Sequence, residues 1–254
     1  MTKYTTLIAL FCLLASPILR GQPADPRIAD YYFQQGELEK AASIYEKLYL
    51  QNAGDYYFER YVSCLMDLNR FEECEKVLNR QIKREPQKVS LYVQYGRLFE
   101  KQNQEPKAAE QYKKAIDKLP ADRFVVDNLA SNFNSMARYD LSMQAYERGG
   151  LLLKNKNIFA FNLAELYRRK DNIAKMVTSY LDALQENPSF LPSVEAMLLR
   201  YSNGESEQTE LQTQLYARIQ DEPKVTIYPE LLSWLFLQKK TIKMPFANSN
   251  RLID

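Results

Sequence analysis

The segment that decides the fold runs from Val89 to Asp122 and reads VSLYVQYGRLFEKQNQEPKAAEQYKKAIDKLPAD. Its apolar residues recur at the spacing of one helix face, first up to Phe99 and again from Ala108. Pro120 closes the second stretch, because proline cannot continue the helical hydrogen-bond ladder. The segment therefore predicts two amphipathic helices joined by a short turn.

The same pattern returns along the chain every 34 residues. Prolines, tyrosines and small or apolar residues each keep this period, and three residue types rarely share one period by chance. The residues in phase are Pro86 and Pro120; Tyr112, Tyr146 and Tyr180; and Val62, Gly96, Ala130 and Ala164.

The repeated unit resembles the tetratricopeptide repeat, whose pattern is W-x2-L-G-x2-Y…A-x3-F-x2-A…P. Five consecutive units in phase cover residues 22–190. The resemblance implies an all-α fold, a right-handed superhelical solenoid of antiparallel helix pairs in which each pair buries its apolar face against its neighbours. In the best unit the matching residues are Tyr92, Tyr95, Gly96, Phe99, Ala108, Tyr112, Ala115 and Pro120.

After residue 190 the pattern weakens. Residues 191–225 are expected to form a divergent sixth helix pair, and residues 226–254 an incomplete seventh unit with an irregular tail. The apolar stretch Tyr228–Lys240 predicts a helix whose second helix does not follow. Three interpretations stay open here: a truncated or frameshifted longer array, an intact chain, or a partner that covers this helix.

The first 21 residues read as a secretory signal peptide. Lys3 precedes the apolar run Leu7–Leu19, which is shorter than the roughly 20 residues of a spanning helix. We expect cleavage after Gly21, with an uncleaved or buried N-terminal helix as the alternative. The location that follows is the periplasm or outer envelope, with secretion also open, and no stable membrane insertion after cleavage.

The charge balance excludes an electrostatic nucleic-acid binder. Loss of Lys3 and Arg20 with the signal peptide would reduce the 34 basic residues to 32, equal to the 32 acidic ones. Proteins that bind nucleic acid usually carry a basic excess on one face.

The residues of enzyme chemistry are mostly missing. The chain has no histidine, which excludes histidine-based triads and zinc sites, and it has no glycine-rich phosphate loop. We therefore expect no enzyme, no cofactor and no metal site. Of the three cysteines, Cys64 and Cys74 remain after the signal peptide, and either a disulfide or two buried small side chains fits them.

The resemblance also implies a binding groove lined by the first helix of each unit. Its expected residues combine aromatic, apolar and charged side chains, as a peptide site requires. The lysine and asparagine clamp of chaperone-binding relatives is absent, although Arg97 alone could hold a carboxylate. The groove residues are Tyr56, Glu59, Ser63, Met66, Val93, Arg97, Glu100, Lys101, Phe124, Asp127, Ser131, Asn134, Ile158, Phe161, Glu165, Arg168 and Arg169.

The function expected from these features is a non-catalytic scaffold of the cell envelope that holds a peptide or partner protein in its groove. The alternative is an assembly subunit that packs, or associates with itself, through Tyr228–Lys240. Glycan binding by stacked tyrosines is weaker, because most tyrosines fall on core positions. Repeat arrays are platforms, so the sequence does not name the partner.

Overall fold

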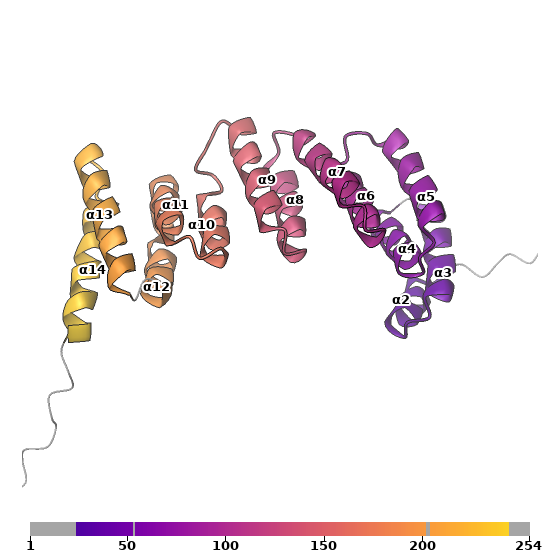
Figure 1. Ribbon diagram of the computed structural model, residues 1–254, viewed down its shortest axis with the longest axis horizontal. Coiled ribbons are helices and arrows are strands. Elements are labelled where there is room, and N and C mark those ends of the chain that lie inside the picture. Colours follow the sequence, from indigo (N-terminus) through magenta and orange to yellow (C-terminus); the bar gives the residue numbers. More distant parts are fainter. Residues whose placement is uncertain (1–23, 53, 202–203, 244–254) are drawn as a thin grey trace, which may run out of the picture. The chain divides into compact units, whose positions relative to one another are not determined.

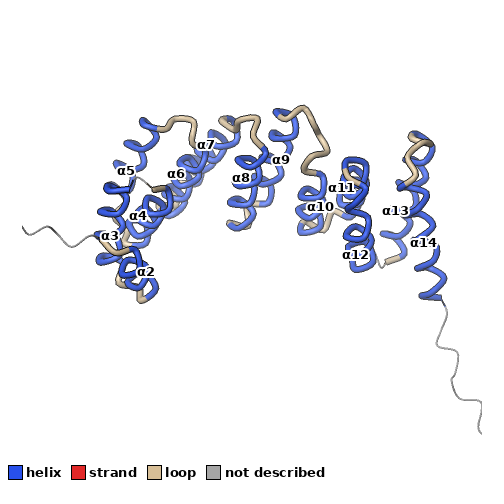
Figure 2. Tube along the Cα trace, turned by 180° about the vertical axis from the view of Figure 1, so that it is seen from behind, coloured by secondary structure: helices blue, strands red, loops and turns tan. Residues whose placement is uncertain are grey.

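The computed structural model describes residues 24–52, 54–201 and 204–243. The predicted signal peptide and the predicted irregular tail after residue 243 lie outside the described residues. Within them the secondary structure is helical, with short loops between helices (Figure 2). The predicted all-α class is confirmed, and the chain divides into two compact units, Met1–Arg80 and Gln81–Asp254.

The N-terminal unit holds the first two helix pairs. Its helices are α2 (Pro26–Gln34), α3 (Leu38–Asn52), α4 (Asp55–Asp67) and α5 (Phe71–Arg84), the last of which crosses the unit boundary. Helix α3 packs against both α2 and α4. Tyr45, Val62 and Leu78 are buried at 0% exposure and form part of this core, because they lie on the apolar face of their helices.

The C-terminal unit continues the series of helix pairs, and helices that follow each other in the sequence lie side by side (Figure 1). The pairs α6/α7, α8/α9 and α10/α11 make the most extensive contacts. The elements are α6 (Val89–Lys101), α7 (Glu105–Asp117), α8 (Arg123–Ser135), α9 (Tyr139–Leu152), α10 (Ala160–Arg169), α11 (Ile173–Glu186), η1 (Pro188–Phe190), α12 (Leu191–Tyr201), α13 (Glu205–Asp221) and α14 (Ile227–Lys243).

The turn inside each pair repeats with the same geometry. Asn69, Asn103, Ala137 and Asp171 all have a positive φ of 55° to 58°, and each stands 34 residues after the one before. The following amide donates back to a carbonyl five residues earlier, as from Arg138 N to Phe133 O at 2.9 Å. This left-handed Schellman turn satisfies the last carbonyls of the first helix and reverses the chain.

The small residues in phase allow the two helices of a pair to approach closely. Cys74 Sγ lies 4.0 Å from the carbonyl oxygen of Val62, and Ser142 Oγ donates to the carbonyl oxygen of Ala130 at 2.8 Å. In the third unit Gly96 occupies the position of Val62 and Ala130, and the ring of Tyr112 fills the space beside it. The residues that recur every 34 positions are therefore those at which the two helices of a pair touch.

The expectation that the Tyr228–Lys240 helix lacks a mate is wrong. Helix α14 packs against α13 and also contacts α11 and α12. Tyr228, Leu231 and Leu235 enter a core that includes Leu211 and Leu215 of α13. The sequence pattern predicted that α12 and α13 form the sixth helix pair. In the structure, Leu211 and Leu215 of α13 share a core with the apolar residues of α14. None of the helices in the described ranges is long and apolar enough to cross a bilayer.

Candidate functional site

A hollow in the C-terminal unit brings together predicted groove residues from two successive repeats. Asn134 of α8 lies there with Phe161 and Glu165 of α10, and Tyr146 of α9 forms part of the wall. The cavity has a volume of about 220 Å³. The remaining lining residues are Ser142, Asn162, Leu166 and Arg169.

The polar groups of this hollow are positioned by hydrogen bonds. Asn162 Nδ2 donates to the Tyr146 hydroxyl at 3.0 Å, and Arg168 Nε donates to Glu165 Oε2 at 3.0 Å. The Tyr180 hydroxyl from α11 donates to the other oxygen of Glu165. Both Glu165 oxygens therefore have partners, which holds the carboxylate in one orientation at the wall.

One polar atom in the hollow has no partner. The side-chain oxygen of Asn134 is buried and accepts no hydrogen bond from the described residues. A buried polar atom without a partner is unfavourable by about 1–3 kcal/mol.

Phe161 forms the apolar wall of the hollow. It packs edge-on against Tyr180, with ring centroids 5.6 Å apart, and against Phe190 at 5.2 Å. These contacts restrict its rotamers. The ring is thus both a wall of the cavity and part of the packing between α10 and α11.

Burial changes the protonation behaviour of neighbouring groups on α8 and α9. Partial burial raises the pKa of Asp127, against the opposing charge of Arg123. Burial and the Asp127 charge likewise raise the pKa of Tyr146. The tyrosine is therefore a neutral hydroxyl at physiological pH and acts only as a hydrogen-bonding group.

In the N-terminal unit, aromatic side chains gather on helices α2, α3 and α4. The Asp30 carboxylate accepts hydrogen bonds from the Tyr45 hydroxyl at 2.6 Å and from the Tyr56 hydroxyl at 2.9 Å. The Arg60 guanidinium lies 5.2 Å from the centre of the Tyr56 ring. Tyr56 and Tyr31 remain 46% and 56% exposed, so both rings are available to a partner.

The predicted groove residues differ in accessibility. Phe124 is the most exposed large hydrophobic side chain among them, at 73%. The exposed members are Tyr56, Glu59, Arg97, Lys101, Phe124, Ser131 and Arg169, and the half-buried ones are Ser63, Glu100, Asp127, Asn134, Ile158, Phe161, Glu165 and Arg168.

Two of the predicted groove residues need correction. Met66 and Val93 are 2% and 3% exposed and belong to the core. Met66 follows Val62 by four residues and Val93 follows Val89 by four, so each lies on the buried stripe of its helix. The groove positions taken from the family therefore do not hold at these two residues.

The hollow also contains residues that lie outside the predicted groove set. Tyr146 was expected only as a core residue, yet its hydroxyl and Asn162 line the cavity. Asn162 could have been predicted from the sequence, because it follows Phe161 on the predicted groove helix.

Cys64 and Cys74 are free thiols in the structure, both fully buried. The possible disulfide is therefore corrected in favour of the packing alternative. Burial raises the pKa of the Cys64 thiol to about 11 and that of Cys74 to about 12. In the part of the chain described, no group of three or more potential metal ligands comes together.

Comparison with known proteins finds one segment of the chain that is similar to a known repeat family. The tetratricopeptide repeat family model matches residues 32–94. This match covers 63 of the 254 residues. Repeats of this family are non-catalytic scaffolds that mediate protein–protein interaction. No curated protein matches the chain.

Several solved tetratricopeptide-repeat and other structures resemble the chain distantly. The C-terminal part of a TPR repeat-containing protein from Cytophaga hutchinsonii is 16% identical over 84% of this chain and 88% of that chain, with a TM-score of 0.36. BtubC from P. vanneervenii is 13% identical over 86% and 96%, with a TM-score of 0.35. The TPR2AB domain of yeast Sti1, solved with pHSP90, is 11% identical over 84% and 95%, with a TM-score of 0.32.

Proposed function

We propose that this chain is an exported, non-catalytic scaffold of the cell envelope that binds a peptide or a segment of a partner protein across its first helices. The observation that carries the proposal is the hollow where Asn134, Phe161 and Glu165 meet. Its mixture of a fixed carboxylate, an unpartnered amide oxygen and an aromatic wall suits an extended chain with both polar and apolar groups.

Phe124 adds an anchor on the same helix as Asn134. Its ring is 73% exposed, and a large exposed aromatic side chain gains most by burial in an interface. Tyr56 and Tyr31 supply similar rings in the N-terminal unit. Each unit thus offers an aromatic surface beside hydrogen-bonding groups.

The test uses a photo-crosslinking amino acid at Ser131, which is exposed on α8, and the same amino acid at Gln144, which is exposed on α9. Irradiated envelope fractions should yield one dominant adduct from position 131 and none from position 144. Equal labelling at both positions, or none at either, would overturn the groove assignment.

The identified partner then allows a quantitative measurement. Phe124→Ala should weaken its binding by about tenfold or more, since aromatic anchors commonly contribute about 2 kcal/mol. Leu151→Ala is a matched control, because Leu151 is also exposed, at 58%, on α9. The melting temperatures of both variants should stay near that of the parent protein.

The proposed location rests on the apolar run Leu7–Leu19 and needs its own test. Fractionation of the native host should recover the chain outside the cytoplasm, with an N-terminus near Gln22 by mass spectrometry. A cytoplasmic chain that begins at Met1 would refute export and leave the groove proposal untouched.

A second candidate function is assembly through the outer face of α14. Phe236 and Leu237 are neighbours there and are 44% and 63% exposed, although the opposite face of the helix is buried. Sedimentation velocity over a range of concentrations tests it. Self-association that Phe236→Ser abolishes would support assembly, and a monomer at every concentration would exclude self-association as its route.

A further inference from the structure

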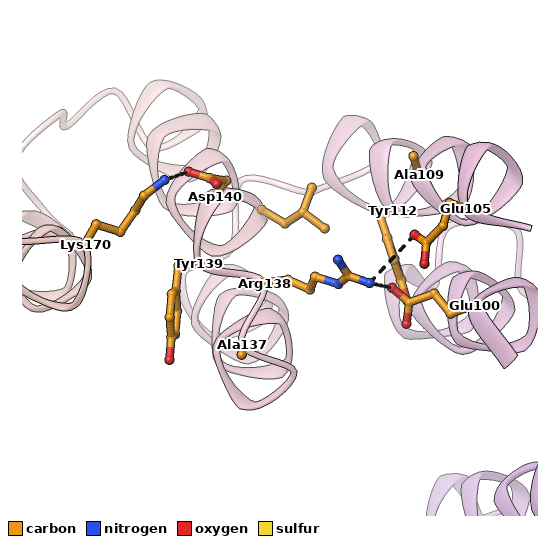
Figure 3. Close-up of a pocket in the computed structure, with 10 residues that line it drawn as sticks. Glu100, Glu105, Ala109, Tyr112, Ala137, Arg138, Tyr139, Asp140 and Lys170 are labelled. Atoms are coloured by element: carbon orange, nitrogen blue, oxygen red, sulfur yellow. Dashed lines mark hydrogen bonds and ion pairs between the residues drawn. The ribbon is translucent and has the colours of Figure 1, made fainter. Parts of the chain in front are cut away.

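A second hollow lies on the edge of the C-terminal unit formed by the turns within the helix pairs, apart from the lining of the first. It opens between the α6/α7 pair and the start of α9, and its volume is about 310 Å³ (Figure 3). Leu141 and Ala109 supply its apolar surface. The charged lining residues are Glu100, Glu105, Arg138, Asp140 and Lys170.

The two cations of this hollow are already engaged by carboxylates. Arg138 reaches across from the α8–α9 turn to Glu100, and Lys170 reaches Asp140 (Figure 3). Glu105 has a looser contact, with its oxygen 3.8 Å from Arg138 and its side chain 68% exposed. Three carboxylates thus face two cations, which leaves Glu105 as the source of excess negative charge.

The wall of the hollow also holds a buried hydroxyl without a hydrogen-bond partner. Tyr112 is only 2% exposed, and its hydroxyl forms no hydrogen bond with the described residues. Burial, together with the nearby Glu100 carboxylate, raises the pKa of Tyr112, so the group remains a neutral hydroxyl. The oxygen of such a hydroxyl can accept a hydrogen bond from a cationic donor that enters the hollow.

Comparison with the equivalent tyrosines of other repeats shows what differs at the Tyr112 hydroxyl. Tyr45 and Tyr180 each donate to an acidic residue fifteen positions earlier, Asp30 and Glu165. Fifteen positions before Tyr112 the residue is Arg97, which offers no acceptor. The third unit therefore retains the tyrosine without an acidic residue at that position, and the carboxylate that acts on its hydroxyl is Glu100.

We propose that this hollow binds the side chain of a lysine or arginine from a partner protein. The alkyl stem would lie on Ala109 and Leu141, and the cationic head would reach Glu105 and the Tyr112 hydroxyl. This site is separate from the hollow around Phe161, because the two hollows share no lining residue, although Glu100 also belongs to the predicted groove set. A single peptide need not occupy both.

The test is a methyl NMR titration of the chain with N-acetyl-lysine N-methylamide. Its matched probe is the norleucine analogue, which keeps the stem and lacks the charge, and an arginine analogue compares the two cations. The lysine probe should shift the Leu141 methyl resonances in a saturable way. The norleucine probe should leave them in place.

Two substitutions locate the contacts. Glu105→Gln should lower the affinity for the lysine probe by about two- to fivefold, as expected for a partly exposed ion pair. Tyr112→Phe should weaken it by a similar factor and leave the melting temperature unchanged or higher, because it removes an unpaired hydroxyl. Glu110→Gln is the control, since Glu110 lies on the same helix and pairs with Lys114.

Several outcomes would overturn the proposal. These are equal shifts with the norleucine probe, no shift at Leu141 with either cation, or unchanged binding in both Glu105→Gln and Tyr112→Phe. A Phe124→Ala variant that binds the lysine probe normally would show that the two sites are separate. That result holds whether or not the groove proposal survives.

Discussion

The backbone of Gly96 on α6 lies directly against the ring of Tyr112 on α7. A Cβ atom placed on Gly96 would stand 2.2 Å from Cε1 of that ring, far inside van der Waals contact. The closest approach of the two helices in the third unit therefore depends on the absence of a side chain at position 96.

Gly96→Ala is expected to lower the free energy of unfolding by about 1–3 kcal/mol, because the added methyl group forces the ring or the helices apart. Helix propensity alone predicts the opposite sign, a gain of about 0.5–1 kcal/mol. Urea unfolding followed by circular dichroism measures the difference. Gly54→Ala is the control, since its Cβ would lie 3.5 Å from Tyr57 in ordinary contact.

Ala137→Asn is expected to stabilise the protein by about 0.5–1 kcal/mol. Ala137 has a φ of 55°, in the left-handed region that asparagine tolerates better than alanine does. Its side chain is exposed, so the change disturbs little packing. The reciprocal change Asn103→Ala, at the equivalent turn, should destabilise by a similar amount, and a loss on Ala137→Asn would contradict the turn argument.

Asp30→Ala is expected to cost about 1–3 kcal/mol of stability, because the fully buried Tyr45 then loses the acceptor of its hydroxyl. In a double-mutant cycle with Tyr45→Phe, the combined loss should be smaller than the sum of the two single losses. Strict additivity would mean that the hydrogen bond contributes nothing to stability.

Cys64 and Cys74 should resist alkylation by iodoacetamide in the folded protein near neutral pH and react quickly in denaturant. The thiolate is the reactive form, and burial raises the two pKa values to about 11 and about 12. Mass spectrometry of labelled samples counts the modified thiols. Rapid labelling of both in the native state would contradict their burial.

The same thiols contribute to the pH dependence of stability. Their folded pKa values lie above the ordinary value of 9.0, so the folded state holds these protons more tightly than the unfolded chain does. Their contribution is complete below about pH 9 and is lost as the pH rises through 11 and 12. Cys64→Ala should reduce this alkaline loss in a pH series of unfolding curves.

The helical class could be predicted from the sequence because it depends on local periodicity. The spacing of Tyr112, Tyr146 and Tyr180 and of Gly96 and Ala130 reports contacts within one helix pair, and such contacts recur wherever the pair recurs. The groove set was predicted less well. Met66 and Val93 lie at predicted groove positions, but each is on the buried stripe of its helix and belongs to the core.

By itself, the sequence determined that the chain forms consecutive helix pairs, because the 34-residue period encodes which faces are apolar and where each helix must end. Only the tertiary structure decided that α14 packs on α13, that Asn134 and Glu165 meet across two repeats, and that the Tyr112 hydroxyl is left without a partner. These features depend on how neighbouring pairs fit together, and that fit is set by side-chain volume and direction, which a period in the sequence does not specify.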